Sequence, residues 1–360
     1  MQNPSQVLYA AGSLVLEDKP IPTLSPRDVL VRIAYVGVCG SDVHFWRHGG
    51  IGAKVDPTRG LVMGHEATGT IHSIGPDVSL VSLGDRVAIE PGVPCRHCTP
   101  CKAGTYNLCK AMRFAAAPGP PGSDGSLDVH GTLCKYFRVA EDFVYRIPDA
   151  VSLQEAVLVE PVSVAVHAVK LVDVRPGETV VVMGSGTIGL LCGAVARVFG
   201  AQRVVLVDVL ERKLEFARGW LGCETWMPDL SATPEVNAEK MLETLGVDGV
   251  DAVIEASGAA SSVETGIHVL RPGGKYVQTG MGKRKIEFPI ATMSEKELMV
   301  RGCFRYGAGD YELAVSLLTK KLIDVKPLIN SVSAFEDTVA AWEKTARGDG
   351  IKNLIRGVEE

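Results

Sequence analysis

The sequence carries no excess of basic residues, because 37 lysines and arginines stand against 42 aspartates and glutamates. This balance excludes the strongly positive surface with which proteins bind nucleic acids or anionic membranes. The amino-terminal residues Met1–Ser5 lack the basic and apolar regions of a secretory signal peptide. Neither an internal repeat nor a low-complexity tail is present. We therefore expect a cytoplasmic protein with no nucleic-acid or membrane partner.

A disulfide framework is also not indicated. Nine cysteines are an odd number, and four of them crowd between Cys95 and Cys109, which favours thiols and metal binding over disulfides. Hydrophobic residues make up 46% and charged residues 22% of the chain, as in a soluble globular protein. A chain of 360 residues is too long to fold around one ordinary hydrophobic core, so we expect two domains.

The pattern of apolar residues differs between two parts of the chain. Residues Gln6–Glu90 show alternating apolar runs broken by Gly, Pro and Asp turns, which predicts a β-rich unit. From Glu178 onward short apolar runs alternate with helical stretches, which predicts a parallel sheet covered on both faces. The strands expected there are Thr179–Met183, Val204–Val207, Ala252–Ile254 and Tyr276–Thr279. Two further helices follow, so we interpret this α/β domain as an insertion into a domain formed by both chain ends.

A glycine-rich turn follows the first of these strands. Gly184, Gly186 and Gly189 fit the dinucleotide-binding pattern, in which they permit a tight turn, a close pyrophosphate and a close helix. A second strand ends in Asp208, about 20 residues beyond the glycines, where an acid accepts hydrogen bonds from the adenosine ribose. The alternatives are a membrane span, which the second strand and the acid argue against, and a glycine turn that binds nothing. Strand, turn, helix, strand and acid together favour nucleotide binding.

Four cysteines form a compact motif, C-x2-C-x2-C-x7-C, with members Cys95, Cys98, Cys101 and Cys109. Four thiolates close a tetrahedral shell with no open position, which is typical of structural zinc. The loop 95–109 has too few apolar residues to fold alone, so metal binding would order it. An iron–sulfur cluster is the competing interpretation.

A second group of potential ligands is scattered along the chain. Three short motifs contain them: one has Cys39, one has the pair His65 and Glu66, and one has Glu160. Each motif alone is weak evidence for a metal site, since a lone cysteine, for example, is usually a small buried hydrophobe. Spacing does not say whether these positions meet in the folded chain.

A resemblance to a known family indicates which of these positions act together, which the spacing alone does not show. It is carried by Gly37–His44, Gly64–Glu66, the four-cysteine loop, Glu160-Pro161, Gly184–Gly189 and Phe304–Tyr306. In these motifs the chain closely resembles the zinc-dependent medium-chain dehydrogenases, and within them the sorbitol and xylitol dehydrogenases. The resemblance implies a doubly wound Rossmann domain, residues 158–298, inserted in a β-rich GroES-like catalytic domain, residues 1–157 and 299–360.

The resemblance also implies a catalytic zinc. Cys39, His65 and Glu66 match its ligands, and Glu160 matches a position that binds the metal or its water. A thiolate, an imidazole and a carboxylate leave one coordination position open for a substrate oxygen, where zinc would make a secondary alcohol far more acidic. Ser41 and His44 match positions of the proton path. Their other interpretation is a turn hydroxyl and a surface histidine.

Substrate contacts follow from the same resemblance. Arg305 and Tyr306 match a pair that contacts polyol hydroxyls, and a guanidinium and a phenol suit vicinal hydroxyls. Phe114 resembles a residue of the substrate-side loop. Phe45 replaces a Tyr of many sorbitol dehydrogenases, and the stretch 117–131 is longer than the usual loop, so the preference among C5 and C6 polyols is open. The longer motif 304–311 is most similar to that of fungal xylitol dehydrogenases.

The cofactor is expected to be NAD, because a carboxylate at Asp208 bonds a ribose 2′-hydroxyl and repels a 2′-phosphate. Lys213 matches a basic ribose contact of the family, and Gly280-Met281-Gly282 matches its nicotinamide-side turn. The remaining cofactor positions implied by the resemblance are Ile188, Phe304 and Arg305.

Other functions are weighed against this one. A non-catalytic NAD(P)-binding relative would lack the metal ligands, whereas this chain carries every candidate ligand. A zinc-binding interaction module would not need a complete nucleotide domain. A sorbitol or L-arabinitol dehydrogenase differs only in substrate. The resemblance suggests a homotetramer or a homodimer.

Overall fold

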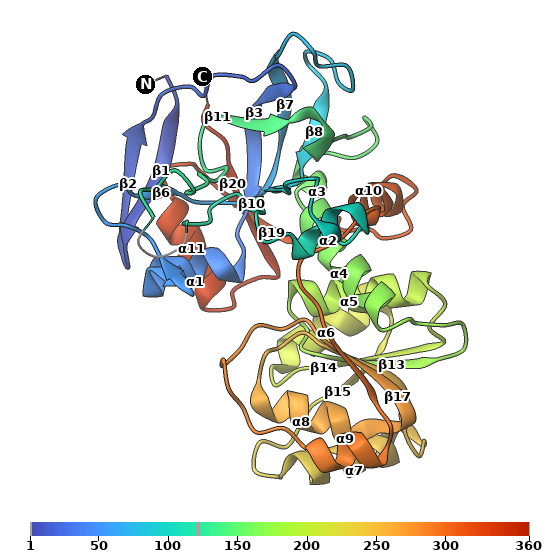
Figure 1. The fold of residues 1–360 in the computed structure, drawn as a ribbon. Helices are drawn as coiled ribbons and strands as arrows, with labels where there is room; N and C mark the ends of the chain where they lie inside the picture. Colours follow the sequence, from blue (N-terminus) through green and yellow to red (C-terminus); the bar gives the residue numbers. More distant parts are fainter. Residues whose placement is uncertain (1, 120–122, 360) are drawn as a thin grey trace. The chain divides into compact units, whose positions relative to one another are not determined.

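The computed structural model describes residues 2–119 and 123–359. The chain forms two compact units: the first unit is Met1–Glu160 with Gly307–Glu360, and the second unit is Pro161–Tyr306 (Figure 1). Among the helices of the described residues, none has both the length and the apolar character needed to cross a bilayer.

The first unit is built on two sheets. The larger has the strand order β12 (Val144–Arg146), β8 (Arg86–Ile89), β7 (Glu66–Ile74), β3 (Asp28–Gly37), β20 (Lys352–Arg356) and β19 (Ile329–Ser333), with β11 (Tyr136–Ala140) also on β3. The smaller has the order β2 (Ser13–Asp18), β1 (Pro4–Ala10) and β6 (Leu61–Val62). Both chain ends therefore contribute strands to this unit, as the sequence predicts.

Short helices and ribbons complete the first unit. They are α1 (Gly40–His48), α2 (Thr99–Lys102), α3 (Leu153–Ala156), α10 (Asp310–Thr319), α11 (Thr338–Ala346) and the ribbons β4–β5 (Gly50–Ile51, Ala53–Lys54) and β9–β10 (Gly92–Val93, Arg113–Phe114). The apolar sides of β3 and β7 and the buried Trp342 of α11 lie in one hydrophobic core. Helix α4 (Val159–Leu171) continues from this unit into the second.

The second unit is a parallel sheet with helices on both faces (Figure 1). Its strand order is β15 (Glu224–Trp226), β14 (Arg203–Val207), β13 (Thr179–Met183), β16 (Val250–Glu255), β17 (Leu270–Gln278) and β18 (Met299–Gly302). Helices α5 (Thr187–Val198) and α6 (Glu211–Leu221) cover one face, and α7 (Pro234–Leu245) and α8 (Ala260–Val269) cover the other; α9 (Ile290–Glu295) precedes β18. This order reverses between β13 and β16, as in a doubly wound nucleotide-binding sheet.

The unit boundaries differ from those proposed from sequence. The structure divides the chain after Glu160 and after Tyr306, whereas the sequence places the divisions after residues 157 and 298. Strand β18 pairs in parallel with β17, for example Tyr276 with Val300, and so belongs to the second unit. A four-residue strand at a sheet edge leaves little signal in the sequence, which explains the difference.

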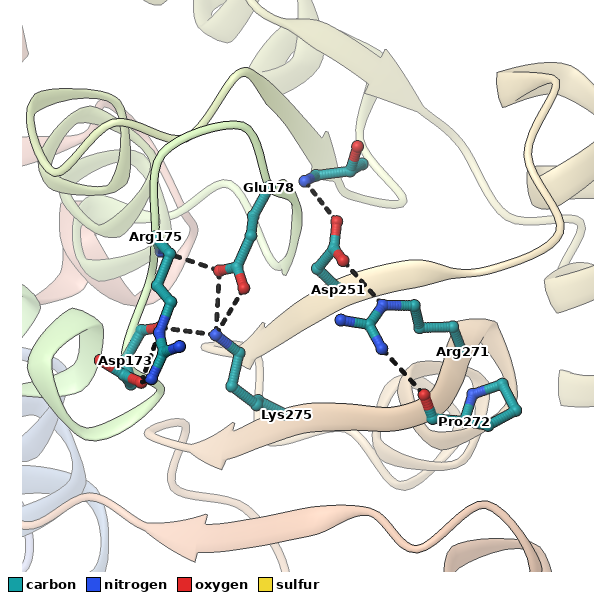
Figure 2. Close-up of polar contacts among 8 residues, drawn as sticks. Asp173, Arg175, Glu178, Asp251, Arg271, Pro272 and Lys275 are labelled. Carbon is teal, nitrogen blue, oxygen red and sulfur yellow. Dashed lines mark hydrogen bonds and ion pairs between the residues drawn. The ribbon is translucent and has the colours of Figure 1, made fainter.

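A charged network closes the amino end of the second sheet (Figure 2). Lys275 of β17 donates to both oxygens of Glu178, at 2.7 and 2.9 Å, and its side chain is only 8% exposed. Asp251 of β16 accepts a bond from the Thr179 backbone at 2.8 Å and pairs with Arg271 at 2.7 Å. These contacts hold the starts of β13, β16 and β17 together, at the end of the sheet opposite the glycine turn.

Candidate functional site

Three of the scattered ligand candidates meet in the first unit. Strands β3 and β7 pair so that Gly37 lies opposite Glu66, and Cys39 follows Gly37 by two residues at the start of α1. A side chain at Gly37 would come within 2.1 Å of the Glu66 carboxylate, so a larger residue there would displace Glu66. One ligand atom each from Cys39, His65 and Glu66 lies within 4.8 Å of the others. The sheet register therefore brings the cysteine to the His-Glu pair.

Asp42 orients two of these residues. One of its carboxylate oxygens accepts a 3.0 Å hydrogen bond from the Cys39 backbone N–H, and the other lies 3.5 Å from His65 Nδ1. A carboxylate on one ring nitrogen leaves the other, Nε2, as the metal-binding atom. Burial disfavours a charged ring, but Asp42 and Cys39 hold the pKa of His65 well above its usual range. The negative charge that causes this shift also favours a bound cation.

Glu66 has a buried cationic partner. Lys352 of β20 donates to the two Glu66 oxygens at 2.9 and 2.6 Å and to the Val38 carbonyl at 3.2 Å. The two side chains are only 3% and 2% exposed. Burial lowers the pKa of Lys352, but the charge of Glu66 more than offsets this and raises it.

The donor set suits a divalent zinc ion. A carboxylate offers about four lone-pair positions, so Glu66 retains positions for a metal beside its two bonds to Lys352. Cysteine sulfur, histidine nitrogen and a carboxylate are the ligands of catalytic zinc sites with an open position. Glu160, which is 7% exposed in the first turn of α4, is not in the group within 4.8 Å, although its charge contributes to the raised pKa of Lys352. Direct metal binding by Glu160 stays a prediction.

Four other predicted residues of the first unit are on helix α1 and strand β10. Ser41 and His44 are on α1, and His44 is exposed with its ring 4.5 Å from that of His48. The half-buried Phe114 of β10 places its ring 5.7 Å from that of His65. Phe45, in contrast, is only 8% exposed and packs in the hydrophobic core. The structure thus brings Phe114 beside the proposed ligands, whereas the substrate role of Phe45 stays a prediction.

The long stretch 117–131 is pinned at its base, where Ala117 and Val129 form a β-bridge. Asp128 accepts a bond from the Gly119 backbone at 2.7 Å and pairs with Arg59 at 3.2 Å. Residues 120–122 lie outside the described part of the chain, so the prediction about this stretch is only partly covered by the structure.

The four-cysteine loop converges on one point. Its sulfurs all lie within 4.8 Å of one another, with Cys98 and Cys101 at 3.4 Å and Cys95 and Cys101 at 4.0 Å. Four sulfurs about 2.3 Å from one zinc lie about 3.8 Å apart, so the loop fits a single ion. An iron–sulfur cluster would spread its thiolates over several irons. Backbone N–H groups of His97 and Cys98 lower the pKa of Cys95 to about 6, which favours the thiolate that binds metal.

The glycine turn of the second unit joins β13 to α5. Gly184 has a φ of +100°, which favours glycine, and a side chain at Gly189 would approach the Gly184 carbonyl to 1.8 Å. A side chain at Gly186 would meet nothing within 4 Å, so the backbone there is open to a ligand. Ile188 lies half-buried in the first turn of α5. The structure therefore shows the tight turn at Gly184 and the close packing at Gly189, whereas the contact of Gly186 with a pyrophosphate stays a prediction.

Asp208 lies beside this turn. Its carboxylate accepts hydrogen bonds from the Ser185 backbone at 2.9 Å and the Leu210 backbone at 3.0 Å. Lys213 of α6 places its Nζ 3.7 Å from the same carboxylate. The predicted acid and base are thus adjacent, at the carboxyl end of β14.

The remaining predicted cofactor and substrate residues follow β17 and β18. A side chain at Gly280 or Gly282 would come within 2.4 Å or 1.8 Å of the Gly258 backbone, so two loops pack back to back here. Met281 is 73% exposed between them. The Arg305 guanidinium lies 4.6 Å from the centre of the Phe304 ring, and Arg305 has a φ of +58°. Tyr306 is 2% exposed.

The sequence analysis did not assign a role to two residues that contact the proposed zinc ligands, Asp42 and Lys352. Asp42 had a usable signal, since an acid three residues after the N-cap residue, here Cys39, is the second half of a capping box. Lys352 had none, because its contact with Glu66 joins positions 286 residues apart.

Two family descriptions match the chain. Residues 25–149 match the alcohol dehydrogenase GroES-like domain, and residues 187–320 match the zinc-binding dehydrogenase domain. A probable D-xylulose reductase A from Aspergillus clavatus is 48% identical over 363 aligned residues, which cover 100% of this chain and 98% of the relative.

Solved structures agree with these matches. An oxidoreductase/dehydrogenase of unknown specificity from Escherichia coli is 31% identical with a TM-score of 0.90, and the match covers 100% of both chains. L-idonate 5-dehydrogenase from Escherichia coli is 29% identical with a TM-score of 0.87, over 98% of both chains. These matches span both units, so the predicted combination of a GroES-like and a Rossmann domain is confirmed.

Proposed function

Since the chain belongs to the zinc-binding dehydrogenases with a GroES-like domain, we propose that it interconverts a polyol and a ketose with NAD. The reaction proposed is xylitol and NAD⁺ to D-xylulose, NADH and a proton. The observation that carries the proposal is the convergence of Cys39, His65 and Glu66 on one point. The substrate is inferred from the relative named D-xylulose reductase A, which aligns over the whole chain.

The residues have separate tasks in this proposal. Cys39, His65 and Glu66 hold zinc, with Glu160 at the metal or its water, and Cys95, Cys98, Cys101 and Cys109 hold the structural ion. When bound, zinc lowers the pKa of an attached hydroxyl, and the nicotinamide accepts hydride. Ser41 and His44 carry the proton away; the exposure of His44 supports its contact with solvent. Phe45, Phe114, Arg305 and Tyr306 contact the polyol.

The cofactor is held by the second unit. In the proposal the pyrophosphate lies against Gly184, Gly186 and Gly189, where the open backbone at Gly186 supports a close approach. Asp208 and Lys213 bind the adenosine ribose. Ile188, the turn Gly280-Met281-Gly282, Phe304 and Arg305 contact the rest of the dinucleotide.

The substrate is tested with a panel of xylitol, sorbitol, L-arabinitol and ethanol, each with NAD and with NADP. We expect the highest kcat/KM for xylitol with NAD, measured by the absorbance of the reduced nicotinamide. A preference for sorbitol or L-arabinitol would keep the enzyme class and replace the substrate. Turnover of none of them, by protein that holds zinc, would contradict the proposal.

Cofactor choice is tested by replacing Asp208 with Ser. The carboxylate repels a 2′-phosphate at a largely buried position, so its removal should raise the ratio of kcat/KM for NADP over NAD by roughly 100-fold. Glu224→Ser is the control, because Glu224 begins β15 and pairs with Arg203. An unchanged ratio in Asp208→Ser would remove Asp208 from the cofactor site.

We also propose a homodimer or homotetramer in the cytoplasm. Strand β18 is the edge of the second sheet, and its residues Met299 and Val300 are 52% and 39% exposed, which supports pairing with another copy. The four-thiolate loop suits a reducing compartment. Light scattering that gives a monomer mass would contradict the assembly.

A further inference from the structure

Glu255 is a fully buried carboxylate at the carboxyl end of β16. It accepts hydrogen bonds from the Ser257 backbone at 2.9 Å, from the Gly258 backbone at 2.9 and 3.0 Å, and from Gln278 Nε2 at 2.7 Å. The Ser257 hydroxyl also contacts it. The backbone carbonyl of Glu255 accepts bonds from Thr279 and Gly280, both at 2.8 Å. This residue therefore joins the loops that follow β16 and β17.

All of these partners are neutral. Backbone N–H groups and an amide donate to the carboxylate, as they do to its ionised form, which only accepts. No lysine, arginine or histidine in the described part of the chain forms an ion pair with Glu255. The buried carboxylate of Glu66, in contrast, has the cation Lys352 as its partner. Both carboxylate oxygens of Glu255 thus accept hydrogen bonds from neutral donors alone, an arrangement that suits the ionised form.

The strand order says which half of a dinucleotide faces this charge. In a doubly wound sheet the two nucleotides lie over the carboxyl ends of the strands, one on each side of the point where the order reverses. Asp208, the ribose-binding acid, ends β14 on one side of β13. Glu255 ends β16 on the other side. The second nucleotide, the nicotinamide half, therefore belongs over Glu255.

We propose that the ionised carboxylate of Glu255 raises the affinity of the protein for oxidised relative to reduced nicotinamide. This inference rests on the proposed use of NAD. The oxidised ring carries a positive charge that the reduced ring lacks, and a nearby negative charge attracts only the former. Glu255 thereby sets the relative affinity for the two cofactor forms, in addition to holding the loops of Gly258 and Gly280.

The test measures the dissociation constants of NAD⁺ and NADH for the zinc-loaded enzyme without substrate, by calorimetry. Glu255→Gln keeps the size of the side chain and removes the charge. Gln278→Lys leaves Glu255 in place and sets a cation at the position of its amide partner. Each variant should raise the ratio of the NAD⁺ to the NADH dissociation constant by roughly tenfold.

Asp251→Asn is the matched control. Asp251 lies on the same strand, β16, but at its amino end in the network of Figure 2. The Asp251→Asn variant should keep the ratio of the two dissociation constants within twofold of the wild-type ratio. Ratios unchanged in both Glu255→Gln and Gln278→Lys, or an equal change in Asp251→Asn, would overturn the inference. Should Glu255→Gln fail to fold, Gln278→Lys decides alone. Wild-type protein that binds neither cofactor form would instead contradict the proposed function.

Discussion

Replacing Cys39 with Ala should lower kcat for polyol oxidation by at least about 10⁴-fold and remove one of two zinc ions per chain. The remaining imidazole and carboxylate do not form the three-ligand site of a catalytic zinc. Without the metal, the pKa of a substrate hydroxyl stays many units higher, which accounts for the large loss. Zinc is counted by atomic emission on dialysed protein, and kcat is measured with the preferred polyol of the panel.

Cys134→Ala is the matched control. Cys134 is a buried thiol of the first unit, whereas Cys39 is half-buried, and the Sγ of Cys134 contacts the Gly131 and Tyr136 carbonyls. We expect two zinc ions and an activity within a few-fold of wild type. If Cys39→Ala keeps both ions, or turns over polyol like the control, Cys39 is not a ligand and the catalytic site is elsewhere.

Replacing Lys352 with Met should lower the free energy of unfolding of the zinc-free protein by about 3–5 kcal/mol, because Glu66 would keep a buried charge without a cation. The hydrogen bonds of 2.9 and 2.6 Å between the two side chains would be lost. Urea denaturation followed by circular dichroism measures this effect. We also expect weaker zinc retention during dialysis, since Glu66 loses the contact that orients it.

Two further variants separate charge from packing. Lys320→Met removes an exposed lysine of the same unit and should change stability by less than about 0.5 kcal/mol. The double variant Glu66→Gln/Lys352→Met removes both charges and should regain most of the lost stability, without regaining activity. If Lys352→Met is as stable as Lys320→Met, the buried pair does not stabilise the fold.

Local patterns predicted much of the fold. The strand expected at Thr179–Met183 has the same bounds in the structure. A strand that is buried on both faces leaves a short apolar run, and neighbouring residues alone decide that pattern. The strand expected at Tyr276–Thr279 is longer in the structure, because Leu270–Gln278 pairs along β16 and β18. Pairing with distant strands sets that length, and no local pattern shows it.

The sequence by itself determined the two local sites of this protein. The spacing of Cys95, Cys98, Cys101 and Cys109, and of the glycines at 184–189, already places each set within a few residues, and short segments have few ways to arrange them. Only the tertiary structure decided that Cys39 meets His65 and Glu66, that Lys352 neutralises Glu66, and that Glu255 does without a cation. These contacts depend on strand register and on packing between segments far apart in the chain. Such contacts produce no local periodicity in the sequence from which they could be predicted.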